Sequence, residues 1–196
     1  MEINGIKLDN NFLKKLSVKF EKKLQDLEKQ IFKISKKKFN IASTKQLGEI
    51  MYNDLKIASL KKTKKGSFAT GAAVLEDLAY KGNEFPKLVL EWRQSSKLKN
   101  TYSDSLPEHL NPNTKRVHTS FLLAATTTGR LASSDPNLQN IPIKTEEGKD
   151  IRKAFISEKN KKLISADYNQ IEMRILADLA DVKELKKAFK NNEDIH

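Results

Sequence analysis

Apolar residues recur at alternating steps of three and four over residues 10–35, and lysines occupy the opposite face. This spacing predicts one long amphipathic helix, which Asp9 or Asn10 can cap. The seam consists of Leu13, Leu16, Phe20, Leu24, Leu27, Ile31 and Ile34. Such a stripe must pack on a partner, most simply a second long antiparallel helix. A free-standing coiled coil is the alternative, although the pattern stops at Ser35-Lys36-Lys37-Lys38.

Two shorter helices are expected next. Ser43-Thr44-Lys45-Gln46 has the form of a capping box, in which two side chains satisfy the first free amides of a helix. Thr70 is expected to cap a third helix, and Gly82 suits its C-terminal stop. The inward residues of the two helices are Leu47, Ile50, Met51 and Leu55, then Val74, Leu75 and Leu78.

Pro86 stands where it can open a fourth helix, because its missing N–H is not needed in the first turn. The apolar pattern runs on through Leu98 towards Tyr102, which is long enough to pair antiparallel with helix 10–35. Trp92 is expected in the core between them. We place a domain change near residues 100–110, where turn residues gather.

The second half differs from the first in its hydrophobic pattern, which predicts strands as well as helices. Residues 117–122 alternate and contain β-branched side chains, which predicts a strand. Residues 152–156 and 162–166 are expected to form two more strands. A helix over 169–181 and an amphipathic piece with Val182, Leu185 and Phe189 follow. These elements predict an α+β fold: a helical part with a long antiparallel helix pair, followed by an incomplete part with antiparallel strands and a helix.

Charge is the most informative bulk property of these 196 residues, whose formal net charge is +12. Residues 1–100 carry 22 Lys and Arg against 11 Asp and Glu, whereas residues 101–196 carry 15 against 14. A basic half suggests a polyanionic partner, although lysine-rich helices can also be merely solvated. There is no cysteine, signal peptide or membrane-length apolar run, so we expect a cytoplasmic protein without a membrane partner.

The turn between the second and third helices is basic and flexible in composition. It combines lysines and small hydroxyl residues with the start of the next helix, and these groups bind phosphates without reading bases. The candidate residues are Lys62, Lys64, Lys65, Ser67 and Thr70. A solvated loop tip is the alternative.

Asp167 is expected at a strand-to-helix corner, after the apolar run 162–165. A carboxylate there, with free neighbouring carbonyls, can hold a hard cation such as Mg²⁺. Taken alone, the corner is more typical of a helix N-cap, which serves only the first amides.

Three motifs occur in order: Thr128-Gly129-Arg130-Leu131, then Asp135 to Pro142 (DPNLQNIP), then Asp167 to Arg174 (DYNQIEMR). Together they resemble the bacterial family A DNA polymerases, the polymerase I type. Lys97 to Tyr102 (KLKNTY) and the terminal Asp194-Ile195-His196 also fit. The resemblance implies that residues 1–103 are a thumb-like DNA-binding subdomain, and that 104–196 are the first part of the palm, reaching the start of the fingers.

The resemblance also implies an activity and its partners. The family adds dNMP from a dNTP to a primer 3′-hydroxyl on primer-template DNA by two-metal phosphoryl transfer. We therefore expect a monomeric, nucleoid-associated bacterial enzyme of replication and repair that uses two Mg²⁺ ions. Asp167 matches the first catalytic carboxylate, which bridges both ions, and Tyr168 would lend its carbonyl to the nucleotide-bound ion.

Further roles carry over from the family residue by residue. Glu172 would lie beneath the incoming sugar, one helical turn from Tyr168 on a shared face, and exclude a 2′-hydroxyl. Arg130 resembles the arginine that reaches the minor groove at the primer terminus. Gln139 and Asn140 resemble residues along the nascent pair, and Asn137, counted with them as DNA-binding, is expected chiefly to shape the loop. Gln170 and His196 join the nucleotide-binding residues, and Lys97 joins the DNA-binding ones.

Departures from the family pattern limit these expectations. Asn169 stands where serine is commonest, and Phe121-Leu122-Leu123-Ala124 replaces a more polar run. The fingers residues and the second metal carboxylate are not found in this chain, so we expect a polymerase fragment that is inactive alone. An exposed apolar patch is expected on the incomplete palm.

The alternative function is a stand-alone, non-catalytic duplex DNA-binding module derived from the polymerase fold. A protein scaffold without nucleic acid is a third possibility. Whether the reading frame continues past His196 would separate the fragment from the module.

Overall fold

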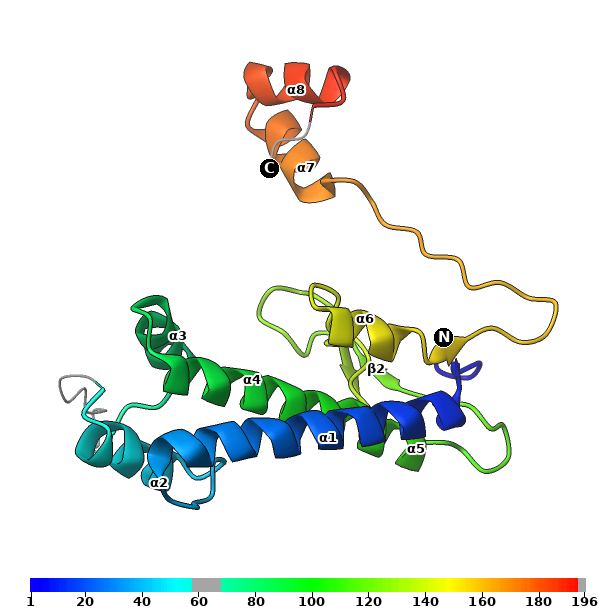
Figure 1. Ribbon diagram of the computed structural model, residues 1–196. Coiled ribbons are helices and arrows are strands. Elements are labelled where there is room, and N and C mark those ends of the chain that lie inside the picture. The colour runs from blue at the N-terminus through cyan, green and yellow to red at the C-terminus, as the bar shows by residue number, and fades with distance from the viewer. Residues whose placement is uncertain (58–67, 194–196) are drawn as a thin grey trace. The chain divides into compact units, whose positions relative to one another are not determined.

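The computed structural model describes residues 1–57 and 68–193. The chain forms two compact units, Met1–Lys159 and Asn160–His196, which are described separately. Figure 1 shows the helices and strands of each. No helix in the described residues is long and apolar enough to cross a membrane.

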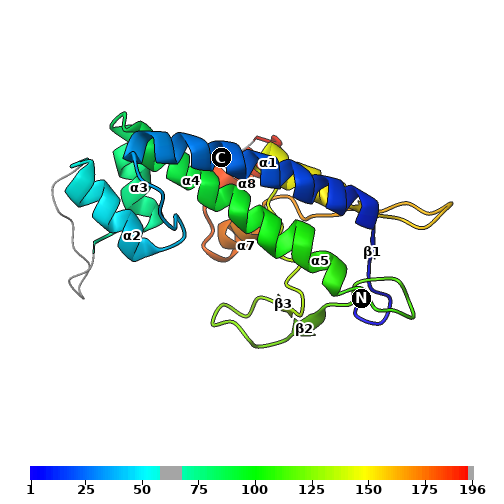
Figure 2. The ribbon, with the colours of Figure 1, turned by 60° about the horizontal axis from the view of Figure 1, so that its bottom comes forward.

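The first unit is built on a pair of long helices, α1 (Asn10–Ser35) and α4 (Glu84–Leu98). They lie side by side in Figures 1 and 2. The start of α1 packs with the end of α4, and the end of α1 packs with the start of α4, so the pair is antiparallel as the sequence predicts. Asp9 caps α1 by accepting a hydrogen bond from the Phe12 amide at 2.9 Å.

Two core clusters fill the length of this pair. One lies where the end of α1 packs on the start of α4, and it contains Leu27, Ile31, Leu47, Met51, Leu75, Phe85 and Val89. The other lies near the N-terminus of α1 and contains Leu13, Leu16, Phe20, Leu98, Tyr102, Leu106, Val117 and Ile151. Trp92 is only partly buried against the first cluster, and its indole N–H donates to Glu28 at 3.1 Å.

Three short helices pack into the first of these clusters, at the end of α1: α2 (Thr44–Glu49), the π-helical turn η1 (Ile50–Asp54) and α3 (Ala72–Tyr80). The Ser43 hydroxyl accepts from the Gln46 amide as predicted, but the Gln46 side chain accepts from the Asn40 amide and does not close a capping box. The predicted cap at Thr70 is wrong, because Gly71 occupies the N-cap position. Thr70 is instead buried, and its carbonyl accepts from Arg93.

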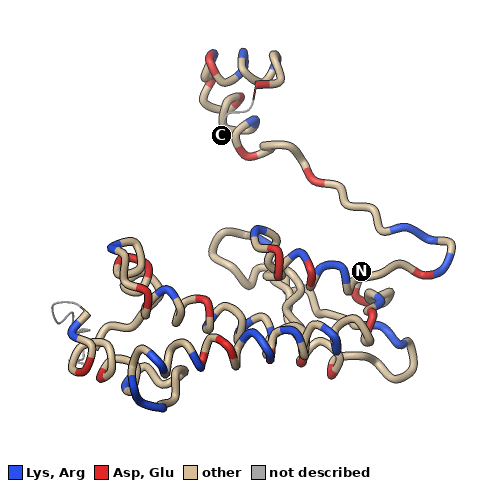
Figure 3. Tube along the Cα trace, viewed as in Figure 1, with Lys and Arg blue, Asp and Glu red and all other residues tan. Residues whose placement is uncertain are grey.

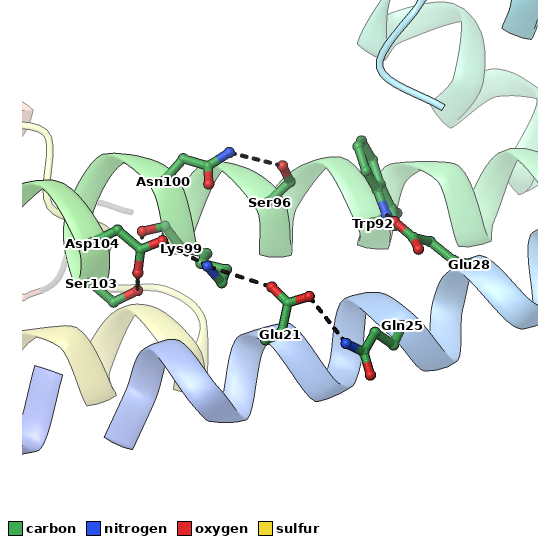
Figure 4. A network of polar contacts seen from close by, with 9 residues as sticks. All are labelled: Glu21, Gln25, Glu28, Trp92, Ser96, Lys99, Asn100, Ser103 and Asp104. Atoms are coloured by element: carbon green, nitrogen blue, oxygen red, sulfur yellow. Dashed lines mark hydrogen bonds and ion pairs between the residues drawn. The ribbon is translucent and has the colours of Figure 1, made fainter. Parts of the chain in front are cut away.

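Beyond α4 the chain continues into the π-helical turn η2 (Lys99–Asp104) and α5 (Ser105–Glu108). Lys99 forms an ion pair within η2 with Asp104 at 2.7 Å, and its ion pair with Glu21 at 3.5 Å joins η2 to α1 (Figure 4). The hydrogen bond to Asp104 raises the pKa of Lys99, despite partial burial. Figure 3 shows basic positions along α1 and in the turn that follows it.

The rest of the unit holds two small antiparallel sheets and one helix. Strand β1 (Lys7–Leu8) pairs with β4 (Phe155–Ile156), and β2 (Ser120–Leu122) pairs with β3 (Ala132–Ser134). The strand predicted over 117–122 is therefore shorter, although Val117 forms single bridges to Ile6 and Leu110. The strand predicted over 152–156 is wrong at its start, because Arg152 ends helix α6 (Glu146–Arg152).

The second unit contains α7 (Ile171–Leu179) and α8 (Lys183–Lys190). The Arg174 guanidinium lies 4.5 Å from the centroid of the Phe189 ring, which joins the two helices. The strand predicted over 162–166 does not form: these residues are exposed and without regular structure, because an apolar run becomes a strand only beside a partner. The expected exposed apolar patch is present at Ile171, Ile175, Leu176 and Leu179.

Candidate functional site

An open hollow of about 470 Å³ lies beside helix α4 in the first unit. It brings together Thr70 and Lys97, which the sequence nominates from separate segments. The hollow also takes in side chains that were not nominated: Thr44, Arg93, Ser96, Asn100 and Thr101. Two cations, hydroxyls and an amide on one concave surface form a donor-rich site suited to anionic oxygens.

Arg93 fixes one wall of this hollow. Its guanidinium donates to the Thr70 carbonyl at 2.6 Å and thereby joins α4 to the start of α3. Burial lowers the pKa of the Arg93 guanidinium below its usual value. Lys97 is exposed, so the hollow has one cation committed to the fold and one facing solvent.

A second group of nominated residues flanks strand β3. Arg130 precedes β3 on an exposed loop, where the Thr126 hydroxyl donates to the Arg130 carbonyl at 2.8 Å. Gln139 and Asn140 follow β3 and are exposed. The Asn137 side chain accepts from the Gln139 amide at 3.0 Å, an Asx-type bond that shapes a loop.

Buried hydroxyl groups support the beginning of the loop that follows β3 and carries Gln139 and Asn140. The hydroxyl oxygens of Thr119 and Ser133 lie 2.6 Å apart, and both are buried. Ser133 accepts from the Leu138 amide at 3.1 Å, and the Thr119 hydroxyl lies 2.8 Å from the Pro136 carbonyl oxygen. The sequence predicted a strand at Thr119 but gave no signal for its contact with Ser133, because the two residues are 14 positions apart along the chain.

A third group of nominated residues belongs to the second unit. Asp167 and Tyr168 are exposed on the segment before α7. Tyr168 precedes the first residue of α7 by three positions, so the predicted shared helical face with Glu172 is wrong. Glu172 lies in the first turn, and Gln170 is the N-cap residue in a left-handed conformation, with φ of 52°.

The start of α7 also bounds a small hollow of about 170 Å³. Gln170 lines it together with Asn169, Arg174, Asn192 and Glu193. Arg174 donates to the Asn169 carbonyl at 2.9 Å and fixes the turn that leads into the helix. The predicted N-cap role of Asp167 is not observed, because Gln170 holds that position.

The donor chemistry at Asp167 suits a hard cation in part. A carboxylate and a neighbouring carbonyl are oxygen ligands of the kind Mg²⁺ prefers. Among the described residues, however, no three His, Asp or Glu side chains form a group able to hold a metal ion. Five further nominations, Lys62, Lys64, Lys65, Ser67 and His196, lie outside the described residues.

Known proteins resemble this chain over its whole length. The family described as DNA polymerase family A matches residues 10–196. A DNA polymerase I of Rhizobium leguminosarum is 52% identical over 196 residues, all of this chain and 19% of that protein. A DNA polymerase I of Caldicellulosiruptor bescii is 49% identical over 196 residues, again all of this chain and 23% of that protein.

A solved structure agrees. The POL domain of Pol1 from M. smegmatis, in complex with DNA primer-template and dNTP, matches with a TM-score of 0.89 and 39% identity. The match covers 98% of this chain and 34% of that one. The chain thus spans about a fifth of the curated relatives it matches, and it carries a fold found in a DNA-bound polymerase domain.

Proposed function

The chain belongs to DNA polymerase family A, and from this membership we propose that it supplies the DNA-gripping part and one metal ligand of a DNA-directed DNA polymerase. The observation that carries the proposal is the match of 98% of the chain, at a TM-score of 0.89, to a polymerase domain described with primer-template and dNTP. The stand-alone binding module is not favoured, since the relatives over the full chain are called DNA polymerase I.

The division of labour follows the predicted subdomains. Residues 1–103 are the thumb and 104–196 the first part of the palm. The hollow beside α4 binds backbone phosphates of the product duplex through Lys97 and the hydroxyls near Thr70. The lysines of the turn, Lys62, Lys64 and Lys65, extend this grip with Ser67. Phosphate contacts position the duplex without reading its sequence.

The loops around β3 contact the primer terminus. Arg130 donates into the minor groove, where the acceptors are shared by every correct base pair, so it senses shape and not sequence. Gln139 and Asn140 line the nascent pair and the template, and Asn137 holds their loop. Both loops leave the same strand, which supports a common target for them.

The second unit provides the chemistry-bearing residues. Asp167 and the Tyr168 carbonyl would hold Mg²⁺, which in this reaction class supports activation of the primer 3′-hydroxyl and departure of pyrophosphate. Gln170, Glu172 and His196 are assigned to nucleotide binding, and Glu172 would exclude a 2′-hydroxyl. We expect the 196-residue chain alone not to extend a primer, because the two-metal reaction needs more carboxylate ligands than Asp167 alone supplies.

Binding of labelled duplex to the purified chain, measured by fluorescence anisotropy over a salt series, tests the thumb proposal. The affinity should fall linearly on a log–log plot against salt and should not depend on sequence. Lys97→Ala should reduce the magnitude of that slope by about 1. Lys14→Ala is the matched control, since it removes the same charge from exposed α1 outside the hollow.

Two results would contradict the proposal. A slope near zero would remove the electrostatic grip. Templated incorporation of dNTP by the chain with Mg²⁺ would contradict its inactivity. Monomeric state and a nucleoid-associated cytoplasmic location remain predictions.

A further inference from the structure

Side chains hold three successive carbonyl groups at the end of the Gln139–Asn140 loop. The Tyr102 hydroxyl donates to the Asn140 carbonyl. Arg152 donates from Nη2 to the Ile141 carbonyl at 2.8 Å and from Nε to the Pro142 carbonyl at 3.0 Å. Neither Tyr102 nor Arg152 is among the residues assigned above to DNA, nucleotide or metal.

We propose that Tyr102 and Arg152 are positioning residues that hold the loop 137–142 so that Gln139 and Asn140 meet the primer-template in a fixed register. The proposal rests on the DNA-binding role given to those two residues. It adds that this role depends on a buried tyrosine at the end of the thumb helix and on an arginine at the end of α6.

Tyr102 is suited to this task because its own position is fixed. It lies in η2, is 2% exposed, and packs in the core cluster that contains Leu98, Leu106 and Ile151. Burial raises its pKa, against a smaller opposite effect of the Arg152 charge, so the hydroxyl stays protonated and able to donate. Because the ring is held by packing, the hydrogen bond from its hydroxyl restrains the Asn140 carbonyl.

The π-helical turn η2, which carries Tyr102, is linked to α1 by side-chain contacts. Lys99 bridges Asp104 and Glu21, and the Ser103 hydroxyl donates to the Lys99 carbonyl at 3.0 Å (Figure 4). η2 continues directly from α4, the helix that also carries Lys97. The loop and the phosphate hollow are therefore attached to one rigid helix.

The position of Arg152 is also fixed by packing and by ion pairs of its helix. The preceding residue, Ile151, is fully buried in the same core cluster. Ion pairs of Lys19 with Asp150 at 2.9 Å and of Lys23 with Glu147 at 2.7 Å connect α6 to α1. The planar guanidinium presents parallel donors, which match two consecutive carbonyls in a way that a lysine ammonium does not.

The loop is thus held at both ends. The Ser133 hydroxyl accepts from the Leu138 amide at the start, and Tyr102 and Arg152 hold the carbonyls at the end. The exposed residues Gln139 and Asn140 lie between these supports. Such support reduces the ordering that binding would otherwise require, which favours affinity by preorganisation.

The first test needs no DNA. Hydrogen exchange of the peptide over residues 137–143 is measured in the full 196-residue chain, in the wild type, Tyr102→Phe and Arg152→Lys. The Leu138 and Gln139 amides, which have side-chain acceptors, should exchange about three- to tenfold faster in both variants. Tyr80→Phe is the matched control, because Tyr80 is 93% exposed, and it should leave exchange unchanged.

The second test measures coupling in binding. Gln139→Ala should weaken primer-template binding in the wild type and have a much smaller effect in the Tyr102→Phe background, because the loop is already misplaced there. Lys97→Ala should weaken binding by the same factor in both backgrounds. A merely structural role of Tyr102 would give additive effects with Gln139 as well.

The outcomes separate the two proposals. A wild-type chain that binds no duplex contradicts the proposed function, and the exchange measurement still decides whether Tyr102 and Arg152 hold the loop. Unchanged loop exchange in both variants, or additive binding effects of Tyr102→Phe and Gln139→Ala, overturns the positioning role. Should Tyr102→Phe fail to fold, Arg152→Lys, which keeps the charge at an exposed site, carries both tests.

Discussion

Gly148 offers a steric test of the same loop. It is the third residue of α6 and is buried. A Cβ built there would lie 2.7 Å from the Pro142 Cβ and 2.9 Å from both the carbonyl carbon and the carbonyl oxygen of Pro142. Carbon atoms in contact prefer about 3.5–4.0 Å, so Gly148→Ala requires a relative shift of about 1 Å between α6 and Pro142.

Two opposing effects set the size of the change in stability. Replacing glycine by alanine inside a helix ordinarily stabilises by about 1 kcal/mol. Overpacking a tight contact costs about 1–3 kcal/mol, and here the obstacle includes backbone, which cannot rotate away. We therefore expect Gly148→Ala to lower the free energy of unfolding by about 0–2 kcal/mol.

The displacement should also disturb the loop. The Pro142 carbonyl oxygen that a Cβ would crowd is the one that accepts from Arg152 Nε at 3.0 Å. Denaturant unfolding, with hydrogen exchange over residues 137–143, measures both consequences. Gly71→Ala is the control, since a Cβ there meets nothing within 4 Å and its site lies at the start of α3. Gly148→Ala that stabilises the chain by about 1 kcal/mol with unchanged loop exchange would refute the close contact.

Two further predictions concern helix α1 and its partners. Hydrogen bonds from Lys153 and then Lys19 lower the pKa of Asp150 below its usual 3.8, so its stabilising effect is complete above that value and is lost as the pH falls below it. Unfolding of Asp150→Asn should accordingly be less pH-dependent than that of the wild type below about pH 4, and equal profiles would contradict the ion pairs. Asp9→Ala should lower the free energy of unfolding by about 1 kcal/mol and Asp9→Asn by much less, because the asparagine oxygen can still accept from the Phe12 amide; equal losses in denaturant melts would argue against the cap.

The helices could be predicted because their signals are local. The seam of helix α1 repeats over seven turns, and Asp9 stands directly before it. Helix α6 was missed although its signals were present: Thr145 caps it, and Glu146 and Glu147 occupy the first turn. Its short length left no apolar period to detect, and the apolar pair Phe155-Ile156 favoured a strand.

The strands could not be predicted with the same success, because a strand depends on its partner. Residues 162–166 have the composition of a buried strand but find no partner within their own unit. Strand β3 consists of Ala132, Ser133 and Ser134, which have low strand propensity, and it forms because β2 pairs with it. Composition alone therefore predicted a strand in the wrong segment.

In the candidate site, too, the residues could be found from the sequence but their contacts in the fold could not. The composition of the basic turn nominated Thr70 and the family resemblance nominated Lys97, and only the packing of α3 against α4 places them in one hollow. Tyr102 and Arg152 were visible as residues, but their common target, the carbonyls of residues 140–142, is 38 and about 10 positions away from them. A contact of that kind has no signal in a single sequence.

The proposed roles also differ in what they require of the fold. The described residues assigned to DNA lie in Met1–Lys159, which has two core clusters and fixes their backbone by named hydrogen bonds. The described residues assigned to metal and nucleotide lie in Asn160–His196, whose buried described residues are Ala177 and Phe189. Substitutions around Tyr102 should therefore change DNA binding while leaving the unit of Asp167 unaltered. On the proposed function, the first unit holds the DNA contacts, and Asp167 would need further oxygen ligands to hold Mg²⁺.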